Sequence, residues 1–236
     1  MTIPHVAVST RRGTRAFNAD ATAVRTADTL TVAAIIDGIG NSAPVAATAQ
    51  LCAQVTARIA ARYGGLAGIL TAGAMIADPG TDDEPDAVAL VAVSDTNSTV
   101  GDLDGTVVSW VGDCRAYGLT DGVLHQYTTD HTVGQQLCAN GVPVELAEQH
   151  NNWVRTSLRH AVVATVYEVV IPAGLVLLTT DGVHDTLTDT DLTALVHTHS
   201  NDPQALVDAI TAAVGTDGDG YRDDATAIAL LPRTDS

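Results

Sequence analysis

LLTTDGVHD, residues 177–185, places an aspartate and a glycine directly after a short apolar stretch that is typical of a buried strand. AAIIDGIG, residues 33–40, repeats the same order, with Asp37 in the place of Asp181. An Asp-Gly pair after a strand is by itself a common turn, because Asp bonds its own backbone and Gly accepts a positive φ. Two copies in the same setting support a second interpretation, in which the carboxylates have a joint chemical role.

The composition favours one folded domain over residues 1–236, with a core made of aliphatic side chains. Hydrophobic residues make up 46% of the chain and aromatic residues only 3%. The formal net charge of −17 disfavours nucleic acids and anionic membrane surfaces as partners, since both are bound by clusters of Lys and Arg. The sequence shows no signal peptide and no membrane span, and its three widely spaced cysteines suit a reducing compartment. We therefore expect a cytoplasmic protein that binds neither nucleic acid nor membranes.

The basic residues exclude several classes of enzyme. All 11 of them are Arg. The chain therefore cannot be a Walker A NTPase, a protein kinase or an enzyme that forms a Schiff base, because each of these needs a lysine.

Cys52 and Arg58 have the C-x5-R spacing of a cysteine phosphatase, but they lie within a predicted helix. A helix interior cannot present its amides to a phosphate group, so this second class is excluded as well.

The order of the predicted elements indicates an α+β fold in which two antiparallel sheets lie face to face with helix pairs outside. Ser42 and Pro44 are expected to begin the first helix, and Gly64 to end it. Residues 132–160 read as short helical pieces and a loop, and the charged residues 78–86 as a surface loop. Strands are expected at 4–9, 21–26, 30–36, 87–94, 105–112, 114–119, 123–127, 161–171, 175–180 and 225–231, and helices at 45–62, 66–77, 189–198 and 203–214.

Three aspartates fall at predicted strand ends that can share one edge of the fold. Asp37 and Asp181 follow strands, and Asp223 precedes the last strand. Carboxylates that converge repel one another unless a divalent cation neutralises them, and oxygen-only ligands favour Mg²⁺ or Mn²⁺. A pair of such ions about 3.5–4 Å apart is a common device for hydrolysing phosphate esters. Arg15 is the candidate for binding the phosphate, with Arg11 or Arg12 as competing candidates.

With these residues in place, the sequence resembles the PP2C (PPM) family of metal-dependent serine/threonine protein phosphatases, in its short bacterial form. The matching motifs occur in family order and span residues 15–226, nearly the whole chain. They are Arg15 with Asn18 and Asp20, Asp37 to Gly40, Gly112 to Arg115, Thr128 to His131, Thr180 to Asp185, and Asp223 to Thr226. The resemblance implies a four-layer α-β-β-α sandwich and the hydrolysis of phosphoserine and phosphothreonine in proteins.

The resemblance also implies a role for each matching residue. Asp37 would bridge two Mg²⁺ or Mn²⁺ ions, the carbonyl of Gly38 would help to hold the second, and Asp181 and Asp223 would complete the first. Asp113 with Asp181 would match a third-metal site of the family. Arg15 would bind phosphate and Asp20 would orient a metal-bound water. Residues 132–160 would form a flap near the substrate.

Four positions depart from the family pattern. Ala19 stands where many relatives carry a polar residue that supports the second metal, and Ile39 stands where some members place a histidine that acts as an acid. Cys114 replaces a serine and Asp224 replaces an asparagine. An alternative therefore remains open, in which the chain is a catalytically impaired module that binds phosphoproteins or regulatory partners. The expected substrates are phosphoproteins made by a Ser/Thr kinase, with an anti-sigma antagonist as one variant.

The glycine-rich segment DGDGYRDD, residues 217–224, resembles a calcium-binding loop at first sight. Taking Asp217 as its first position places Arg222 where such a loop needs a glycine. We therefore interpret the segment as a flexible approach to the last strand.

Overall fold

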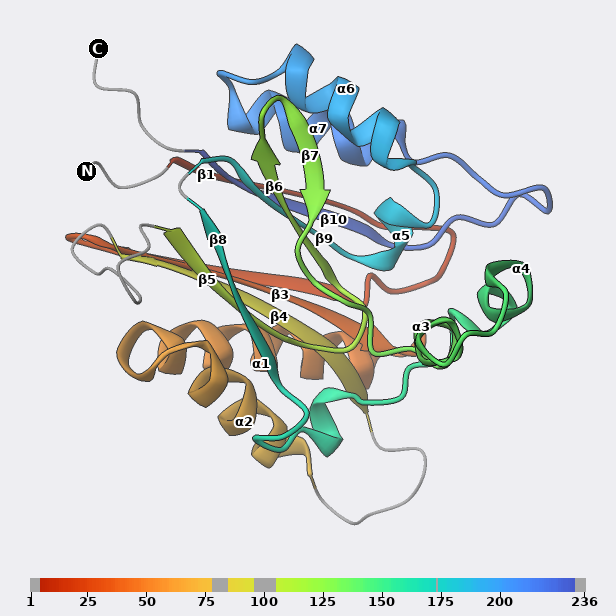
Figure 1. Ribbon diagram of the computed structural model, residues 1–236. Coiled ribbons are helices and arrows are strands. Elements are labelled where there is room, and N and C mark those ends of the chain that lie inside the picture. The colour runs from red at the N-terminus through yellow and green to blue at the C-terminus, as the bar shows by residue number, and fades with distance from the viewer. Residues whose placement is uncertain (1–4, 78–84, 96–104, 173, 232–236) are drawn as a thin grey trace.

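The computed structural model describes residues 5–77, 85–95, 105–172 and 174–231. Two five-stranded sheets lie face to face, and a pair of helices covers the outer side of each (Figure 1). The predicted α+β class and its four-layer α-β-β-α order are therefore confirmed. Within the described residues, no helix is both long and apolar enough to cross a membrane.

The first sheet has the strand order β2-β3-β4-β5-β8, with antiparallel pairing throughout. Its strands are β2 (Asp20–Ala27), β3 (Leu30–Ile39), β4 (Asp86–Asp95), β5 (Gly105–Val111) and β8 (Tyr167–Pro172). Its outer face is covered by the helices α1 (Ala43–Tyr63) and α2 (Gly65–Ile76).

The second sheet has the order β1-β10-β9-β6-β7 and is also antiparallel throughout. Its strands are β1 (His5–Arg11), β6 (Arg115–Thr120), β7 (Val123–Gln126), β9 (Val176–Thr179) and β10 (Ala225–Leu231). Its outer face is covered by α6 (Asp189–Thr198) and α7 (Pro203–Ala213). The shorter helices are α3 (Val133–Ala139), α4 (Val144–Ala147), α5 (Asp181–His184) and the 3-10 turns Glu148–His150 and Leu158–His160.

The central strand β3 shows how the sequence builds these layers. Val32, Ala34 and Ile36 pack against α1 and α2, whereas Ala33 and Ile35 pack against the second sheet. Because successive side chains point to opposite faces and both faces are buried, the strand reads as a continuous apolar run. Apolar packing therefore fills both the helix–sheet layer and the layer between the sheets.

The first helix begins and ends as predicted. The hydroxyl of Ser42 accepts a hydrogen bond from the backbone N–H of Val45 at 3.3 Å, and Pro44 lies in the first turn. Gly64 ends the helix with a φ of 85°, a conformation that favours glycine. The cap and the stop signal are therefore confirmed.

The predicted strand at 161–171 is wrong over its first half, because β8 begins only at Tyr167. The hydroxyl of Thr165 accepts a hydrogen bond from the N–H of Val162 at 2.9 Å and donates to its carbonyl at 3.1 Å. A threonine side chain that bonds nearby backbone offers the chain an alternative to a strand. The β-branched run at 162–166 therefore forms a turn.

Two further predicted boundaries differ from the structure. The strand predicted at 30–36 continues to Ile39, so that Asp37 lies inside β3 rather than beyond its end. Residues 78–84 of the predicted charged loop lie outside the described residues, and its last residue, Asp86, begins β4.

Candidate active site at one end of the sandwich

Strand β3 places Asp37 at the edge of the layer between the two sheets. Asp37 is opposite Asp20 on β2 and opposite Val88 on β4. Side chains alternate along a strand, so Asp37 lies on the same face as Ile35, which packs toward the second sheet. The register of the first sheet therefore sets two carboxylates side by side where the apolar layer ends.

Other elements bring three more predicted aspartates to this edge. Asp113 follows β5 after Gly112, whose φ of 98° turns the chain. Asp181 begins α5 after β9, and Asp223 lies two residues before β10. Figure 1 shows α5, the approach to β10 and the β1–β2 connection gathered at the end of the sandwich away from both termini.

A cavity of about 410 Å³ opens at this end. Six of the seven predicted site residues line it: Arg15, Asp37, Gly38, Asp113, Asp181 and Asp223. The other lining residues are Ile39, Gly40, Val88, Asn152, Val154, Gly182, Asp185, Thr186, Gly215, Asp217, Tyr221 and Arg222. We call Asp37, Asp113, Asp181 and Asp185 the acidic wall, and Arg15, Tyr221, Arg222 and Asp223 the loop wall.

The acidic wall is electrostatically crowded. Burial, followed by the carboxylate of Asp181, raises the pKa of Asp113 to about 7. Burial, followed by the carboxylate of Asp223, raises the pKa of Asp181 to about 6. The pKa of Asp37 is raised well above its usual value, again by burial first and by Asp181 second. These side chains hold their charges only at a cost, which protons or a bound cation would remove.

Asp20 lies beside Asp37 but is not among the residues that line the cavity. The hydroxyl of Thr180 donates a hydrogen bond to Asp20 Oδ2 at 2.9 Å, and the N–H of Thr226 donates to that hydroxyl at 3.0 Å. Burial raises the pKa of Asp20 to about 8, although hydrogen bonds from Thr226 and Thr180 oppose the shift. Asp20 therefore lies next to Asp37 of the acidic wall, outside the cavity lining.

Arg15 is the predicted phosphate-binding arginine, and it lies on the loop wall. Its Nη2 contacts Asp223 Oδ2 at 3.1 Å, and its guanidinium carbon lies 5.5 Å from the centre of the Tyr221 ring. Burial lowers the pKa of Arg15, but the carboxylate of Asp223 and its acidic neighbours outweigh this, so the net shift is upward. Arg15 therefore keeps its charge beside the acidic wall.

The competing candidates Arg11 and Arg12 have other contacts and do not line the cavity. Arg11 Nη1 donates to three carbonyls at the end of α7, those of Thr211, Ala212 and Val214, each at 3.2 Å. This is a favourable place for a cation, because the last carbonyls of a helix lack partners. Arg12 Nη1 donates to a carbonyl of its own loop, that of Ala16, at 3.0 Å.

Asp224 joins the two loops of the loop wall. Its carboxylate accepts hydrogen bonds from the backbone N–H of Gly13 at 2.7 Å and of Ala19 at 2.8 Å. Asp224 is only 2% exposed, and the bond to Ala19 is buried while the bond to Gly13 is half-buried. The change from the family's asparagine therefore has a structural use, because both carboxylate oxygens serve as acceptors.

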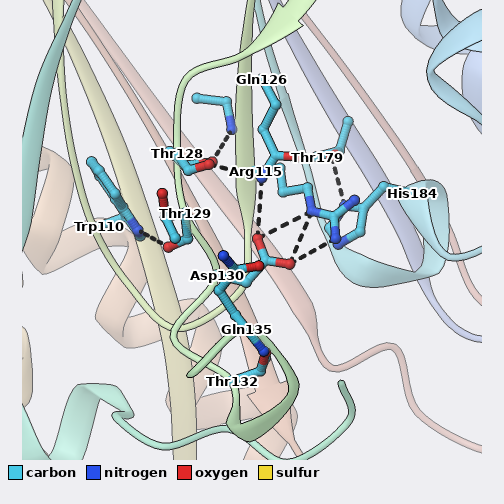
Figure 2. Close-up of polar contacts among 11 residues, drawn as sticks. Trp110, Arg115, Gln126, Thr128, Thr129, Asp130, Thr132, Gln135, Thr179 and His184 are labelled. Carbon is cyan, nitrogen blue, oxygen red and sulfur yellow. Dashed lines mark hydrogen bonds and ion pairs between the residues drawn. The ribbon is translucent and has the colours of Figure 1, made fainter. Parts of the chain in front are cut away.

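A second network fixes the turn that carries Asp113. Arg115 forms a fork on Asp130, with its Nη2 2.7 Å from Asp130 Oδ2 (Figure 2). Close by, the N–H of Gly112 donates to Nδ1 of His131 at 3.2 Å. The motifs at 112–115 and 128–131 are thus bonded to each other. Arg115 is therefore bound to Asp130 and does not line the cavity.

Several lining residues were missed from the sequence. Tyr221 and Arg222 belong to the segment interpreted as a flexible approach to β10, but Asp217 organises that segment. Its Oδ1 accepts hydrogen bonds from the N–H of Asp219 at 3.0 Å and of Tyr221 at 2.8 Å. The Asp and Gly content of this segment was the available signal, because Asp side chains commonly order turns in this way.

Residues 132–160 form the predicted short helical pieces. Two residues of this segment, Asn152 and Val154, line the cavity. Asp185, which ends the 180–185 motif, was given no role from the sequence and lies on the acidic wall. No histidine lines the cavity within the described part of the chain.

The donor set of the acidic wall fits a hard divalent cation, since carboxylate oxygens from buried, mutually repelling groups face one cavity. In the described residues, however, no group of three or more His, Cys, Asp or Glu side chains forms a ready metal site. One candidate ligand, Asp223, has its Oδ2 in contact with Arg15 Nη2 at 3.1 Å. The chemistry of the lining residues fits a metal, although their side chains are not arranged as a ready metal site.

Known proteins match this chain in structure but not in sequence. No protein-family model and no curated protein matches this sequence. Among solved structures, a serine/threonine phosphatase of S. agalactiae matches with a TM-score of 0.79 and 17% identity, over 98% of this chain and 100% of that one. Phosphatase Stp1 from Staphylococcus aureus matches with a TM-score of 0.80 and 16% identity, over 99% of this chain and 96% of that one.

The catalytic domain of phosphatase PstP, solved in complex with 2 manganese ions, matches with a TM-score of 0.70 and 22% identity. The match covers 97% of this chain and 98% of that one. These similarities extend over nearly the whole chain, as the ordered motifs do. The chain therefore has the fold of the bacterial PPM, or PP2C, serine/threonine phosphatases.

Proposed function

We propose that this chain hydrolyses phosphoserine and phosphothreonine in proteins, in a reaction that depends on Mg²⁺ or Mn²⁺. The observation that carries the proposal is the cavity in which Asp37, Asp113, Asp181 and Asp223, from four distant parts of the chain, face Arg15. The fold supports the same reaction class, because its solved relatives are serine/threonine phosphatases. The substrates would be products of a Ser/Thr kinase in the cytoplasm.

The residues would divide the work as follows. Asp37 would contact two ions, with the carbonyl of Gly38 at the second and with Asp181 and Asp223 at the first. Asp113 and Asp181 would hold a third ion if one binds. When bound, such ions neutralise the phosphate and acidify the attacking water.

Arg15 would bind the phosphate through the donors that Asp223 leaves free. A guanidinium has five N–H donors, and the contact with Asp223 uses only one nitrogen. Asp20, held by Thr180, would orient the water from behind Asp37. Ile39 lines the cavity but has no proton to give, so the leaving group must be protonated by another group or by solvent.

One observation favours the second candidate function, a phosphoprotein-binding module without turnover. Ala19 is buried, and a Cβ added at Gly38 would lie 3.3 Å from the Cβ of Ala19. The position where relatives carry a polar supporting residue is therefore closely packed here and apolar. Binding by Arg15 would survive this change, whereas support for the second ion would not.

Turnover of p-nitrophenyl phosphate and of a phosphothreonine peptide, measured with Mn²⁺ and then with EDTA, tests the proposal. We expect turnover with Mn²⁺, its loss with EDTA and its return with excess Mn²⁺. Binding of the peptide without turnover in either Mn²⁺ or Mg²⁺ would establish the module instead.

A further inference from the structure

Two arginines line the cavity within the described residues, and only one of them has a carboxylate partner. Arg15 pairs with Asp223, whereas Arg222 forms no ion pair with any described carboxylate. The guanidinium of Arg222 donates from Nη2 to the carbonyl of Arg12 at 3.3 Å, and its Nε is buried without a partner. Arg222 therefore lines the cavity with a guanidinium that no described carboxylate neutralises.

The backbone of Arg222 is held in place, unlike that of a typical surface arginine. Its carbonyl accepts hydrogen bonds from the N–H of Thr14 at 2.9 Å and from the hydroxyl of Thr14 at 3.1 Å. Gly13 packs so closely on this carbonyl that no side chain would fit there. The loop before β10 and the β1–β2 loop thus fix the direction from which Arg222 reaches the cavity.

The surroundings make an unpaired arginine unusual. The chain carries 28 acidic residues against 11 arginines, so carboxylate partners are plentiful. A guanidinium fork without one, at the edge of a substrate cavity, suits an anionic group brought by a ligand. Arg12 is a useful contrast, because it also forms no ion pair with a described carboxylate but does not line the cavity.

Arg15 and Arg222 are held by different anchors, which separates their roles. Arg15 is held by Asp223, next to the acidic wall where the hydrolysed phosphate would lie. Arg222 is held by the carbonyl of Arg12, the first residue after β1. A group that contacts Arg222 would therefore belong to a neighbouring part of the substrate.

We propose that Arg222 binds a second anionic group of the substrate, a carboxylate or a phosphate on a residue next to the phosphorylated one. This subsite rests on the proposed function, because it takes Arg15 as the residue that binds the hydrolysed phosphate. It makes the enzyme selective for acidic or multiply phosphorylated segments.

The test compares three phosphothreonine peptides, whose neighbouring residue is Ala, Asp or phosphoserine. The readout is kcat/KM for removal of the threonine phosphate from each anionic peptide, divided by the same constant for the Ala peptide. We expect this ratio to be about tenfold in the unmodified enzyme, the size of one charge-assisted hydrogen bond. Arg222→Ala should bring it close to one, and Arg222→Lys should restore part of it. The two anionic peptides show which source of negative charge is preferred.

Arg12→Ala is the matched control, because it removes a neighbouring positive charge that does not line the cavity, and it should keep the ratio. A ratio near one in the unmodified enzyme would overturn the proposal, as would an unchanged ratio in Arg222→Ala. Circular dichroism and thermal melting would show that each variant is folded.

If the unmodified enzyme turns over none of the peptides, the proposed function fails separately from the subsite. Fluorescence anisotropy of the same labelled peptides then measures binding in place of turnover. Tighter binding of the anionic peptides that Arg222→Ala removes would support the subsite, and equal binding of all three peptides would overturn it.

Discussion

The acidic wall and the loop wall of the cavity are held in place by different kinds of structure. Asp37 is fixed by the pairing of β3 with both neighbouring strands, and Asp113 and Asp181 lie within two residues of strand ends. The residues of the loop wall lie on two segments, 12–15 and 215–224, which are joined mainly by side-chain and backbone hydrogen bonds. The sheets therefore position the acids, whereas loop packing positions the arginines.

This difference suggests a division of labour. The acidic wall, on a rigid scaffold, would serve the chemistry common to the fold. The loop wall, on segments about 200 residues apart in sequence, would set which substrate is bound. Changes in the two walls should therefore affect different kinetic constants.

The largest effect is expected from Asp181→Asn on the acidic wall. Removing one ligand charge should lower kcat by about a thousandfold, since a metal ion contributes several kcal/mol to stabilising the transition state. The melting temperature should be unchanged or higher, because burial, Asp223 and Asp185 already oppose the charge of Asp181. Steady-state assays with Mn²⁺ and thermal melting measure the two quantities.

Asp28→Asn is the matched control for this change. It removes the same charge from an exposed turn with a φ of 43°, where asparagine is well tolerated. A near-normal rate for Asp181→Asn would remove the acidic wall from the mechanism.

Asp224→Ala should have the next largest effect, and it should act on the loop wall. It leaves the buried N–H of Ala19 and the half-buried N–H of Gly13 without acceptors, which should lower the free energy of unfolding by about 3 kcal/mol. KM should rise as well, because the loop that carries Arg15 loses its anchor. Urea denaturation measures the first effect, with Asp208→Ala on the exposed side of α7 as the control. Equal stability of the two variants would show that the loops do not need this link.

Arg15→Ala should raise KM for a phosphothreonine peptide by about ten- to a hundredfold, the loss of one or two charge-assisted hydrogen bonds. Its effect on stability should be small, because the pair with Asp223 is partly exposed. Arg15→Lys should recover the charge but not the fork, and should give an intermediate KM. An unchanged KM in Arg15→Ala would move phosphate binding to another arginine, with Arg222 as the first to test.

The smallest effect is expected at Tyr221, whose ring lies against Arg15. Tyr221→Leu should raise KM about two- to fivefold, because an exposed cation–π contact contributes about 0.5–1 kcal/mol. Tyr221→Phe keeps the ring and should retain the normal KM. If both variants raise KM to the same extent, the hydroxyl and not the ring of Tyr221 positions Arg15.

Part of the acidic wall could be predicted from local sequence, whereas Asp113 was proposed from the resemblance and Asp185 was given no role. An apolar strand that ends in Asp and Gly is a local pattern, and antiparallel pairing carries such ends to shared edges of the sheets. Asp37, Asp181 and Asp223 were therefore expected at one edge without knowledge of tertiary contacts, and all three line one cavity. Asp20 was proposed from the resemblance, and its place beside Asp37 but outside the cavity lining depends on the β2–β3 register.

The loop wall could be predicted only in part, at Arg15 and Asp223. The contact between Thr14 and Arg222 joins residues 208 positions apart. No local sequence pattern in either segment predicts this contact. The segment containing Tyr221 looked flexible because of its glycines, whereas the side chain of Asp217 orders it. The turn at Val162 was missed for a related reason, because the hydroxyl of Thr165 outweighed a β-branched run.

The central claim is that carboxylates from distant parts of the chain share divalent ions at one end of the sandwich. A crystal soaked in Mn²⁺, with data collected at the manganese absorption edge, tests it most directly. We expect anomalous peaks inside the cavity, in contact with Asp37 and Asp181, and their loss in crystals of Asp181→Asn. Crystals with no anomalous peak in this cavity, or with manganese bound only elsewhere on the protein, would contradict the account.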